Sequence, residues 1–391
     1  MNLSQLMLKE RKLAIGLMSG TSLDGIDACL VEIKGCGVGT TVHLIDFISE
    51  EYSSDEKKRI LMLCSPDTSN VADICKTNID LGRKFGKTAK KLMEKNNLKA
   101  SEVDFISSHG QTIYHMPEAG ATLQIGELAE IASITGCLTI GDYRPSDMAV
   151  GGQGAPLVTY TDYILFTSSE KGRVLINIGG ISNLTALRAN SSEDDILAFD
   201  CGPGNMLIDR VITILTDDKY RFDEDGNIAL KGNVNSELLD LIIQRDDFVL
   251  LSPPKSTGRE QYNEDMVKEL LSLKEKFKVS FEDFIATITA YTYTAISDNI
   301  KKFVSSRITI DEVYVGGGGA KNKAILKGLR ESLDVDVYTM EQLNFSSDAK
   351  EAIAFAILGN EFLNGKSNNL KSATGAKKSA IMGKLVYPPC L

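Results

Sequence analysis

Acidic side chains, hydroxyls and glycines gather in three short segments that could bind a phosphorylated ligand. The first, GLMSGTSLDGID at 16–27, combines three glycines with three hydroxyls and two carboxylates. A glycine-rich turn lets backbone N–H groups approach phosphate oxygens, and the hydroxyls add donors. Asp24 or Asp27 could bind Mg²⁺ beside the phosphates, directly or through water. A plain surface hairpin is the alternative, since the segment is neither a P-loop nor a GxGxxG motif.

The second segment, FDCGPGN at 199–205, places Asp200 at the end of an apolar strand. Open α/β folds bind ligands at this edge of the sheet, so Asp200 could accept a proton from a nucleophile as a general base. Gly202, Gly204 and the amides that begin the next helix could receive a phosphate. The alternative is an aspartate that only orders the turn.

The third segment, GGGGAKN at 316–322, ends a strand with four consecutive glycines, which are Gly316, Gly317, Gly318 and Gly319. Glycines leave no side chain in the way of a flat group, so adenine or ribose could lie against this backbone. A flexible loop is the alternative. Ordered patterns before and after the segment favour nucleotide contact.

Three single residues add candidate polar groups. His109 follows a strand in SSHGQT, although a lone histidine is more often a hydrogen-bonded core residue. Arg144 could hold a carboxylate through two parallel hydrogen bonds, or pair with a neighbouring acid. Glu351 is the only carboxylate in the apolar helical run AKEAIAFAIL, where burial would imply a polar contact or a raised pKa. KSTGRE at 255–260 is predicted to be a surface loop.

Composition narrows the class of protein. A chain of 391 residues with 43% hydrophobic and 25% charged residues predicts a soluble globular protein with two domains. A net charge of −10 disfavours nucleic-acid binding, which needs a basic surface. Seven cysteines without CxxC pairing indicate reduced thiols in a cytosol. No run approaches the roughly 20 apolar residues of a membrane span, and no signal peptide is evident.

The elements that must position these segments form a repeated plan. Two apolar stretches around a polar turn predict a hairpin at 13–33, and a second one follows at 174–188. The repeat predicts two lobes of the same topology. Strands are expected at 103–108 and 196–200, the latter leading into a helix at 206–215. A further helix is expected near Pro156, and apolar residues at helical spacing predict another over 284–303.

Taken together and in order, the motifs resemble those of the anhydro-N-acetylmuramic acid kinase family. They run from about Leu13 to Pro388 and comprise MSGTSLDGID, HGQT, LQIGE, DYRPSD with GGQGAPLV, NIGGISNLT, FDCGPGN, KSTGRE, GGGGAKN, EAIAFA and a terminal TGA. The resemblance implies an α/β fold like that of actin, the Hsp70 ATPase domain and hexokinase. Each of its two lobes would be a mixed sheet flanked by helices, hinged over a central cleft. Residues 1–145 with 372–391 would form one lobe and 146–371 the other.

The resemblance also implies a reaction, in which ATP, water and 1,6-anhydro-N-acetylmuramic acid give N-acetylmuramic acid 6-phosphate and ADP. This step would serve peptidoglycan recycling and amino-sugar metabolism in the cytoplasm, with Mg²⁺ on the phosphates. A kinase of another anhydro-sugar, such as levoglucosan, is the alternative. The expected partners are the sugar and ATP, without nucleic acid or membrane, and a homodimer is left open.

Matching the family's motifs residue by residue gives the expected roles. Asp200 would be the catalytic base, and Arg144, Glu351 and His109 would lie at the sugar. Tyr143 and Cys201 depart from the Phe and Thr that are frequent in the family, and neither change removes a group that the chemistry needs. The first ATP segment comprises Gly20, Thr21, Ser22, Leu23, Asp24, Gly25, Ile26 and Asp27.

Overall fold

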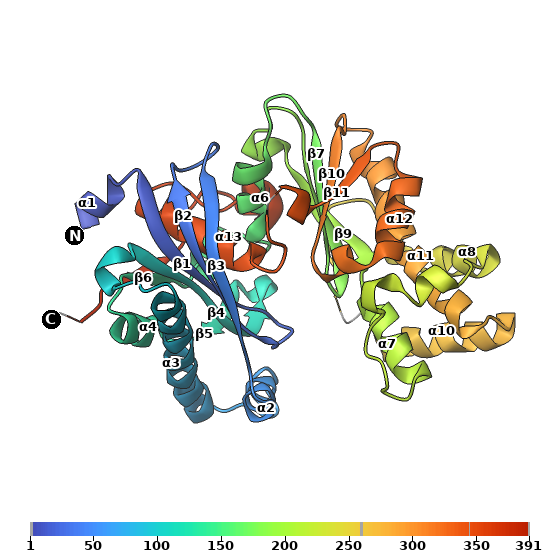
Figure 1. Cartoon of the computed structure of the whole chain (residues 1–391), viewed down its shortest axis with the longest axis horizontal. Coiled ribbons are helices and arrows are strands. Elements are labelled where there is room, and N and C mark those ends of the chain that lie inside the picture. The colour runs from blue at the N-terminus through green and yellow to red at the C-terminus, as the bar shows by residue number, and fades with distance from the viewer. Residues whose placement is uncertain (1–2, 259–260, 344, 390–391) are drawn as a thin grey trace. The chain divides into compact units, whose positions relative to one another are not determined.

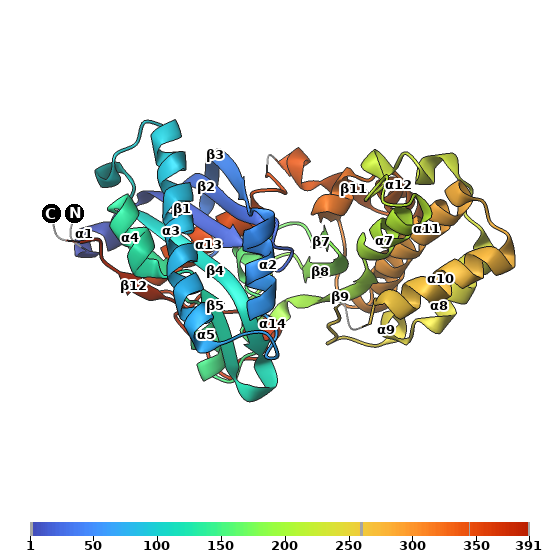
Figure 2. The same ribbon diagram turned by 90° about the horizontal axis from the view of Figure 1, so that it is seen from below.

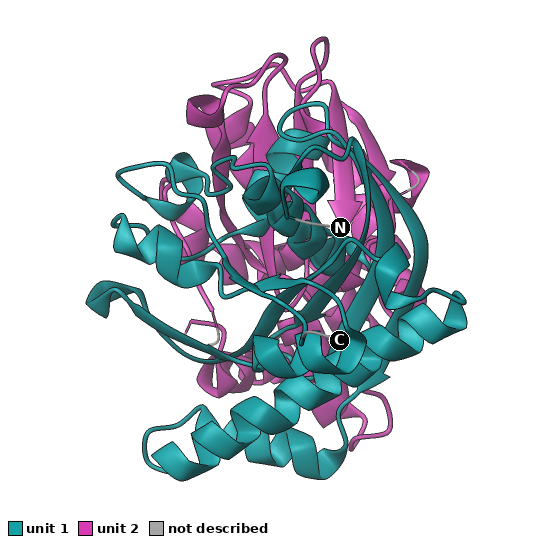
Figure 3. Cartoon of the chain, turned by 90° about the vertical axis from the view of Figure 1, so that its left-hand side faces the viewer, with its two compact units in different colours: residues 1–165, 348–391 teal, residues 166–347 magenta. Residues whose placement is uncertain are grey.

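The computed structural model describes residues 3–258, 261–343 and 345–389. The chain forms two compact units, coloured separately in Figure 3: residues 1–165 with 348–391, here unit 1, and residues 166–347, here unit 2. The boundaries expected from the sequence were 145/146 and 371/372. They differ because the helix at 350–363 packs on the first sheet, a long-range contact that local sequence does not reveal.

Unit 1 is built on a mixed sheet whose strands run in the order β12-β6-β4-β1-β2-β3, with β5 paired to β4. Strands β1, β2 and β3 are antiparallel, whereas β4 is parallel to β1 and β6 is parallel to β4. The elements of the unit are α1 (Leu3–Met7), β1 (Arg11–Ser19), β2 (Gly25–Lys34), β3 (Thr41–Glu51), α2 (Ser54–Leu63), α3 (Val71–Lys95), β4 (Phe105–Met116), β5 (Ala121–Ile125), α4 (Leu128–Thr135), β6 (Thr139–Gly141), α5 (Arg144–Ala149), α6 (Val158–Phe166), α13 (Lys350–Leu363), α14 (Lys371–Thr374) and β12 (Lys384–Val386).

Helices cover both faces of this sheet (Figure 1, Figure 2). Alternation along β1 sends Ile15 and Leu17 into a core with Phe85 of α3. The opposite face meets α13 so closely that a Cβ on Gly16 would lie 1.9 Å from the carbonyl oxygen of Ala352. Only glycine allows this approach, which fixes the helix against β1, the first strand of the hairpin at 13–33.

Unit 2 repeats the plan with a sheet in the order β11-β10-β7-β8-β9. Strands β7, β8 and β9 are antiparallel, and β10 and β11 continue parallel to β7. The elements of the unit are β7 (Arg173–Ile178), β8 (Ile181–Leu187), β9 (Leu197–Pro203), α7 (Met206–Leu215), α8 (Ser236–Arg245), α9 (Asp247–Leu250), α10 (Glu264–Phe277), α11 (Phe281–Asn299), β10 (Glu312–Gly316), α12 (Lys323–Ser332) and β11 (Asp336–Thr339), with a π-helical turn at Ile300–Val304.

The two sheets therefore share one topology: β1, β2, β3, β4 and β6 correspond in order and direction to β7, β8, β9, β10 and β11. The predicted duplication and the predicted fold, a mixed sheet flanked by helices in each half, are confirmed. Local signals explain several boundaries, such as Asn322, whose side chain accepts hydrogen bonds from the first amides of α12. The predicted hairpins, the strand before Asp200 and helix 206–215 are all present.

One strand is longer than expected. Strand β4 was predicted to end at Ser108, but it continues through His109 and Gln111 to Met116 because its second half pairs with β5. The HGQT motif is thus part of a strand in the sheet, where neighbouring strands hold its side chains in place.

Candidate active site

The 16–27 segment forms the end of β1, the start of β2 and the turn between them in unit 1, here called the first hairpin. The turn closes through a hydrogen bond from the Leu23 amide to the Gly20 carbonyl, at 3.3 Å. Leu23 adopts a left-handed backbone with φ 58° and buries its side chain beneath the turn. Thr21, Ser22 and Asp24 remain exposed. The turn therefore has an apolar anchor and a polar outer surface, as a phosphate-binding turn requires.

Gln111 of the HGQT motif supports this turn from the neighbouring strand. Its Oε1 accepts a hydrogen bond from Ser19 Oγ at 2.7 Å, and its Nε2 donates to the Gly20 carbonyl at 3.2 Å. Gln111 and Ser19 are both fully buried. Gln111 lies in the HGQT motif but could not be predicted at the turn, because only the pairing of β4 with β1 brings it there.

Two carboxylates of unit 1 are electrostatically coupled. Loss of hydration raises the pKa of Asp27, which is half-buried, and the nearby Asp348 and Asp24 raise it further against a hydrogen bond from Ser49. The pKa of Glu351 is also raised, first by desolvation and then by Asp27, while Lys350 and Arg144 oppose the shift.

Glu351 lies in the first turn of α13 and is exposed, unlike the apolar residues that follow it in the helix. The raised pKa that the sequence suggested is nevertheless present. An exposed carboxylate on a helix fixed to β1 is well placed to meet a polar ligand.

Arg144, at the start of α5, is held by two acceptors. Its Nε and one terminal nitrogen lie 3.1 and 2.9 Å from Nε2 of His109, and its other terminal nitrogen donates to the Gly154 carbonyl at 2.6 Å. Burial lowers the pKa of Arg144 to about 10, with Glu351 and Asp147 opposing, so the guanidinium stays cationic at neutral pH. The Arg144 guanidinium is therefore a cation of unit 1 whose position is fixed by His109 and the Gly154 carbonyl.

His109 serves as the acceptor for Arg144 and is itself buried, with 5% of its surface exposed. Its Nδ1 lies 2.9 Å from the Gly110 carbonyl and 3.3 Å from the Ser19 carbonyl, so this nitrogen carries the proton and Nε2 accepts from Arg144. Burial, and then the charge of Arg144, lower the pKa of His109 to about 3. The ring is neutral at physiological pH.

Asp147, one turn along α5, orders the loop that carries Gly154. It is completely buried and accepts hydrogen bonds from the Gly154 amide, from Asn369 and from Thr374, all at 2.8 Å. The terminal TGA motif therefore acts here as a support. Through Asp147 and Gly154 it stabilises the position of Arg144.

The buried neutral histidine makes stability depend on pH. A folded-state pKa near 3 against about 6.5 in the unfolded chain means that His109 stabilises the fold fully above pH 6.5 and progressively less as pH falls toward 3. From pH 7.5 to pH 5 we expect wild type to lose about 2 kcal/mol more unfolding free energy than His109→Gln, at roughly 1.4 kcal/mol per pH unit. Urea unfolding at several pH values measures this slope. The exposed residue His43 provides the control His43→Gln, and an unchanged slope in His109→Gln would contradict the prediction.

Asp200 lies in the middle of β9 in unit 2, because the strand predicted to end at Asp200 continues to Pro203 by pairing with β8. The 255–257 segment holds its carboxylate. Its Oδ2 accepts hydrogen bonds from Ser256 Oγ at 2.9 Å and from the Thr257 amide at 2.8 Å, while its own amide donates to the Lys255 carbonyl at 3.2 Å. The KSTGRE motif was predicted to be a plain surface loop, and its first three residues instead fix the orientation of Asp200. Residues 259 and 260 of that motif lie outside the described residues.

Three glycine-containing turns meet in unit 2. The amides of Gly204 and Asn205 each donate at 2.8 Å to the β7–β8 turn, to the carbonyls of Gly180 and Gly179. A Cβ on Gly204 would lie 2.2 Å from the Gly179 carbonyl, and one on Gly317 would lie 2.7 Å from the Ile178 carbonyl. Backbone atoms therefore line the place where the second hairpin, the FDCGPGN turn and the GGGG turn meet. Gly202 lies in β9, Gly316 ends β10, and Gly317 to Gly319 form the turn after it.

Sequence analysis did not assign Gly179, Gly180 or Asn205 to the site. The side-chain Nδ2 of Asn205 donates to the Ile178 carbonyl at 3.4 Å and lies beside Gly318, so this residue joins two of the turns. The repeated hairpin was the signal that could have identified Gly179 and Gly180, since they occupy the same turn as Gly20 to Asp24 does in unit 1.

The predicted site residues are thus divided between the units. Unit 1 brings together the first hairpin with His109, Arg144 and Glu351, and unit 2 brings Asp200 together with the second and third glycine segments. Within the described residues, no group of three or more His, Cys, Asp or Glu side chains could hold a metal ion. A pair of carboxylates such as Asp24 and Asp27 is smaller than such a group, and Mg²⁺ usually takes only one or two carboxylates with water and phosphate as its other ligands, so the prediction of Asp24 or Asp27 stays a prediction.

The duplicated sheet, with a glycine turn between the first two strands of each copy, defines a protein of the actin, Hsp70 and hexokinase class. A family model described as anhydro-N-acetylmuramic acid kinase matches residues 12–388. The chain belongs to the anhydro-N-acetylmuramic acid kinase family, as its motifs indicated.

Similar proteins match over almost their whole length. A protein named anhydro-N-acetylmuramic acid kinase from Caldanaerobacter subterraneus subsp. tengcongensis is 45% identical over 96% of this chain and 97% of its own. Proteins of the same name from Bacillus thuringiensis subsp. konkukian and Clostridioides difficile are each 44% identical, covering 96% of this chain and 99% and 98% of theirs. Among the residues that the structure describes, none of the helices is long and apolar enough to cross a membrane.

Proposed function

We propose that this protein is an ATP-dependent kinase that opens the 1,6-anhydro ring of 1,6-anhydro-N-acetylmuramic acid and phosphorylates its 6-oxygen. The observation that carries the proposal is the family match over residues 12–388, at 44–45% identity to proteins of that name. The levoglucosan alternative has no support among these relatives. The residues found in each unit fit the chemistry of the reaction.

Asp200 is the proposed general base. It takes a proton from water while the water oxygen bonds to the anomeric carbon. The bond between that carbon and the 6-oxygen breaks, and the 6-oxygen receives the γ-phosphoryl group of ATP, which leaves ADP. A carboxylate held at one oxygen by Ser256 and Thr257 has a fixed direction, which such an in-line attack requires.

Arg144 is proposed to bind the lactyl carboxylate of the sugar. A fixed guanidinium can form charge-assisted hydrogen bonds to a carboxylate, and it offsets repulsion from a protein whose net charge is −10. His109 acts behind it as an acceptor that orients the guanidinium. Glu351 is the proposed hydrogen-bond partner for sugar hydroxyl or amide groups.

The glycine turns are the proposed nucleotide contacts. Gly20 to Asp27 in unit 1 and Gly202, Gly204 and Gly316 to Gly319 in unit 2 offer backbone amides and side-chain-free surface for phosphates and adenosine. Asp24 or Asp27 would hold Mg²⁺, which when bound offsets the negative charge of the phosphates. Cytoplasmic location is part of this proposal, as the reaction needs the cell's ATP.

An ATP-coupled assay with purified 1,6-anhydro-N-acetylmuramic acid tests the proposal. We expect ADP and N-acetylmuramic acid 6-phosphate in equal amounts, with the phosphate located by NMR. In water labelled with ¹⁸O the label should enter at the anomeric hydroxyl, because water attacks the anomeric carbon. Ring opening without ATP, or faster turnover of levoglucosan, would reject the proposal.

A further inference from the structure

The side chain of Lys255 occupies an unusual place for a lysine in a segment expected to be a surface loop. Its ammonium group lies over three aromatic rings, 4.9 Å from the centre of Phe248, 5.5 Å from Phe303 and 5.9 Å from Phe199. Burial lowers the pKa of Lys255, as expected for a cation withdrawn from water. An uncompensated cation at this place would be costly, so its contacts must offset the loss of hydration.

Those contacts are the carbonyl groups at the end of α9. Lys255 Nζ donates to the Phe248 carbonyl at 3.1 Å and to the Val249 carbonyl at 3.0 Å. The Phe248 carbonyl also accepts a hydrogen bond from the Leu251 amide at 3.1 Å, and hydrogen bonds from a charged donor to carbonyl oxygens are stronger than those between neutral groups. The rings and carbonyls together hold the ammonium group at one point of unit 2.

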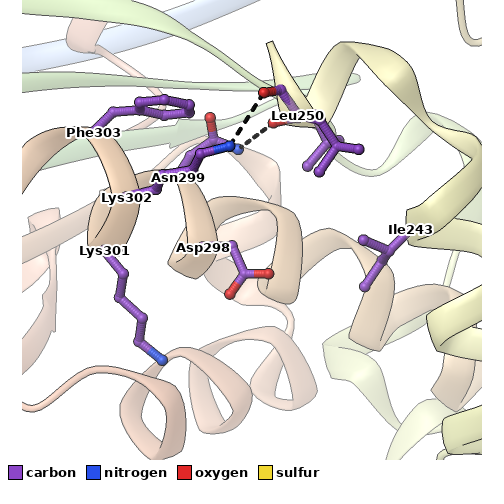
Figure 4. Close-up of a pocket in the computed structure, with 8 residues that line it drawn as sticks. Ile243, Leu250, Asp298, Asn299, Lys301, Lys302 and Phe303 are labelled. Atoms are coloured by element: carbon purple, nitrogen blue, oxygen red, sulfur yellow. Dashed lines mark hydrogen bonds between the residues drawn. The ribbon is translucent and has the colours of Figure 1, made fainter. Parts of the chain in front are cut away.

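A second side chain ties the same helix end to the strand that bears Asp200. Asn299, at the end of α11 and almost fully buried, donates to the carbonyls of Val249 at 3.4 Å and of Cys201 at 3.2 Å. Figure 4 shows Asn299 beside α9, at a surface cavity of about 380 Å³, with the side chain of Lys301 pointing away. Asn299 therefore links the end of α9 to β9 through these two hydrogen bonds.

Lys255 and the two residues that follow it all contact Asp200. The Lys255 carbonyl accepts from the Asp200 amide, and Ser256 and Thr257 donate to Asp200 Oδ2. We propose that Lys255 is a positioning residue for Asp200, because its anchored ammonium group holds the 255–257 segment that orients the carboxylate. This inference rests on the proposed role of Asp200 as the base.

The test compares Lys255→Met and Lys255→Arg with the control Lys301→Met, which removes an exposed lysine nearby. For Lys255→Met we expect kcat to fall about 30-fold, with KM for ATP and for the sugar changed less than about 3-fold, since misplacing a reacting group by an ångström can cost roughly 100-fold. The acid limb of the kcat/KM profile should move to higher pH, because a positive charge near the carboxylate is lost. Lys255→Arg should regain most of the rate, and Lys301→Met should match wild type.

Ser256→Ala keeps the test decisive if Lys255→Met fails to fold. Ser256 is exposed, so its loss should leave the unfolding free energy unchanged while kcat falls about 5-fold. A normal kcat in Ser256→Ala or in folded Lys255→Met would overturn the inference. So would a further 30-fold loss when Lys255→Met is added to Asp200→Asn, since Lys255 would then act independently. Near-normal turnover in Asp200→Asn alone would instead reject the base assignment.

Discussion

Asp200→Asn is expected to lose nearly all turnover while binding ATP normally. Asparagine has the same shape and can still accept the hydrogen bonds of Ser256 and Thr257, so the 255–257 segment should keep its place. It cannot take a proton from water at neutral pH. General-base catalysis contributes roughly 100- to 10,000-fold, and we expect kcat to fall within that range.

Single-turnover rates and ATP titration by calorimetry would measure the two halves of this prediction. Asp240→Asn, which changes an exposed aspartate on α8, is the matched control and should retain full activity. A variant at Asp200 that kept more than about a third of wild-type kcat would show that another group removes the proton. A variant that lost ATP affinity as well would place Asp200 at the nucleotide.

Arg144→Met is expected to weaken binding of 1,6-anhydro-N-acetylmuramic acid. A charge-assisted pair with the lactyl carboxylate is worth roughly 2–3 kcal/mol, so KM for the sugar should rise about 30- to 140-fold while KM for ATP stays unchanged. Arg144→Lys should recover only part of the loss, because a lysine cannot form the two parallel hydrogen bonds that the fixed guanidinium offers. Steady-state kinetics with each substrate varied in turn would check this.

A second sugar separates the role of the carboxylate from general damage. 1,6-Anhydro-N-acetylglucosamine has the same ring without the lactyl group, so Arg144→Met should process it as wild type does. Equal losses for both sugars would mean that Arg144 only supports the local structure. His109→Gln should give a smaller loss in the same direction, since it removes an acceptor behind Arg144 and leaves the cation.

The parts of the fold that sequence predicted were those set by local pattern. Both hairpins, the strand before Asp200 and the helix after it follow from alternating apolar residues and glycine turns. The boundary between the units near residue 348 could not be predicted from local pattern. It depends on the packing of α13 on β1, which lies more than 300 positions earlier in the sequence. No local signal encodes a contact at that separation.

The candidate site shows the same limit. Asp200, Arg144 and His109 stood out by residue type and motif, yet the groups that orient them did not. Gln111 reaches the first hairpin because the extended strand β4 pairs with β1, which places Gln111 opposite Ser19. Ser256 reaches Asp200 through the anchored 255–257 segment. Such supporting roles depend on tertiary contacts, which composition and spacing leave undetermined.

The close contact between Gly16 and Ala352 has a mechanical consequence. Because no space remains between β1 and α13 for even a methyl group, neither element can slide or tilt against the other without a steric clash. Gly20 in the first hairpin and Glu351 at the start of α13 are therefore carried on a single rigid piece. We therefore expect a displacement of this hairpin to move Glu351 with it.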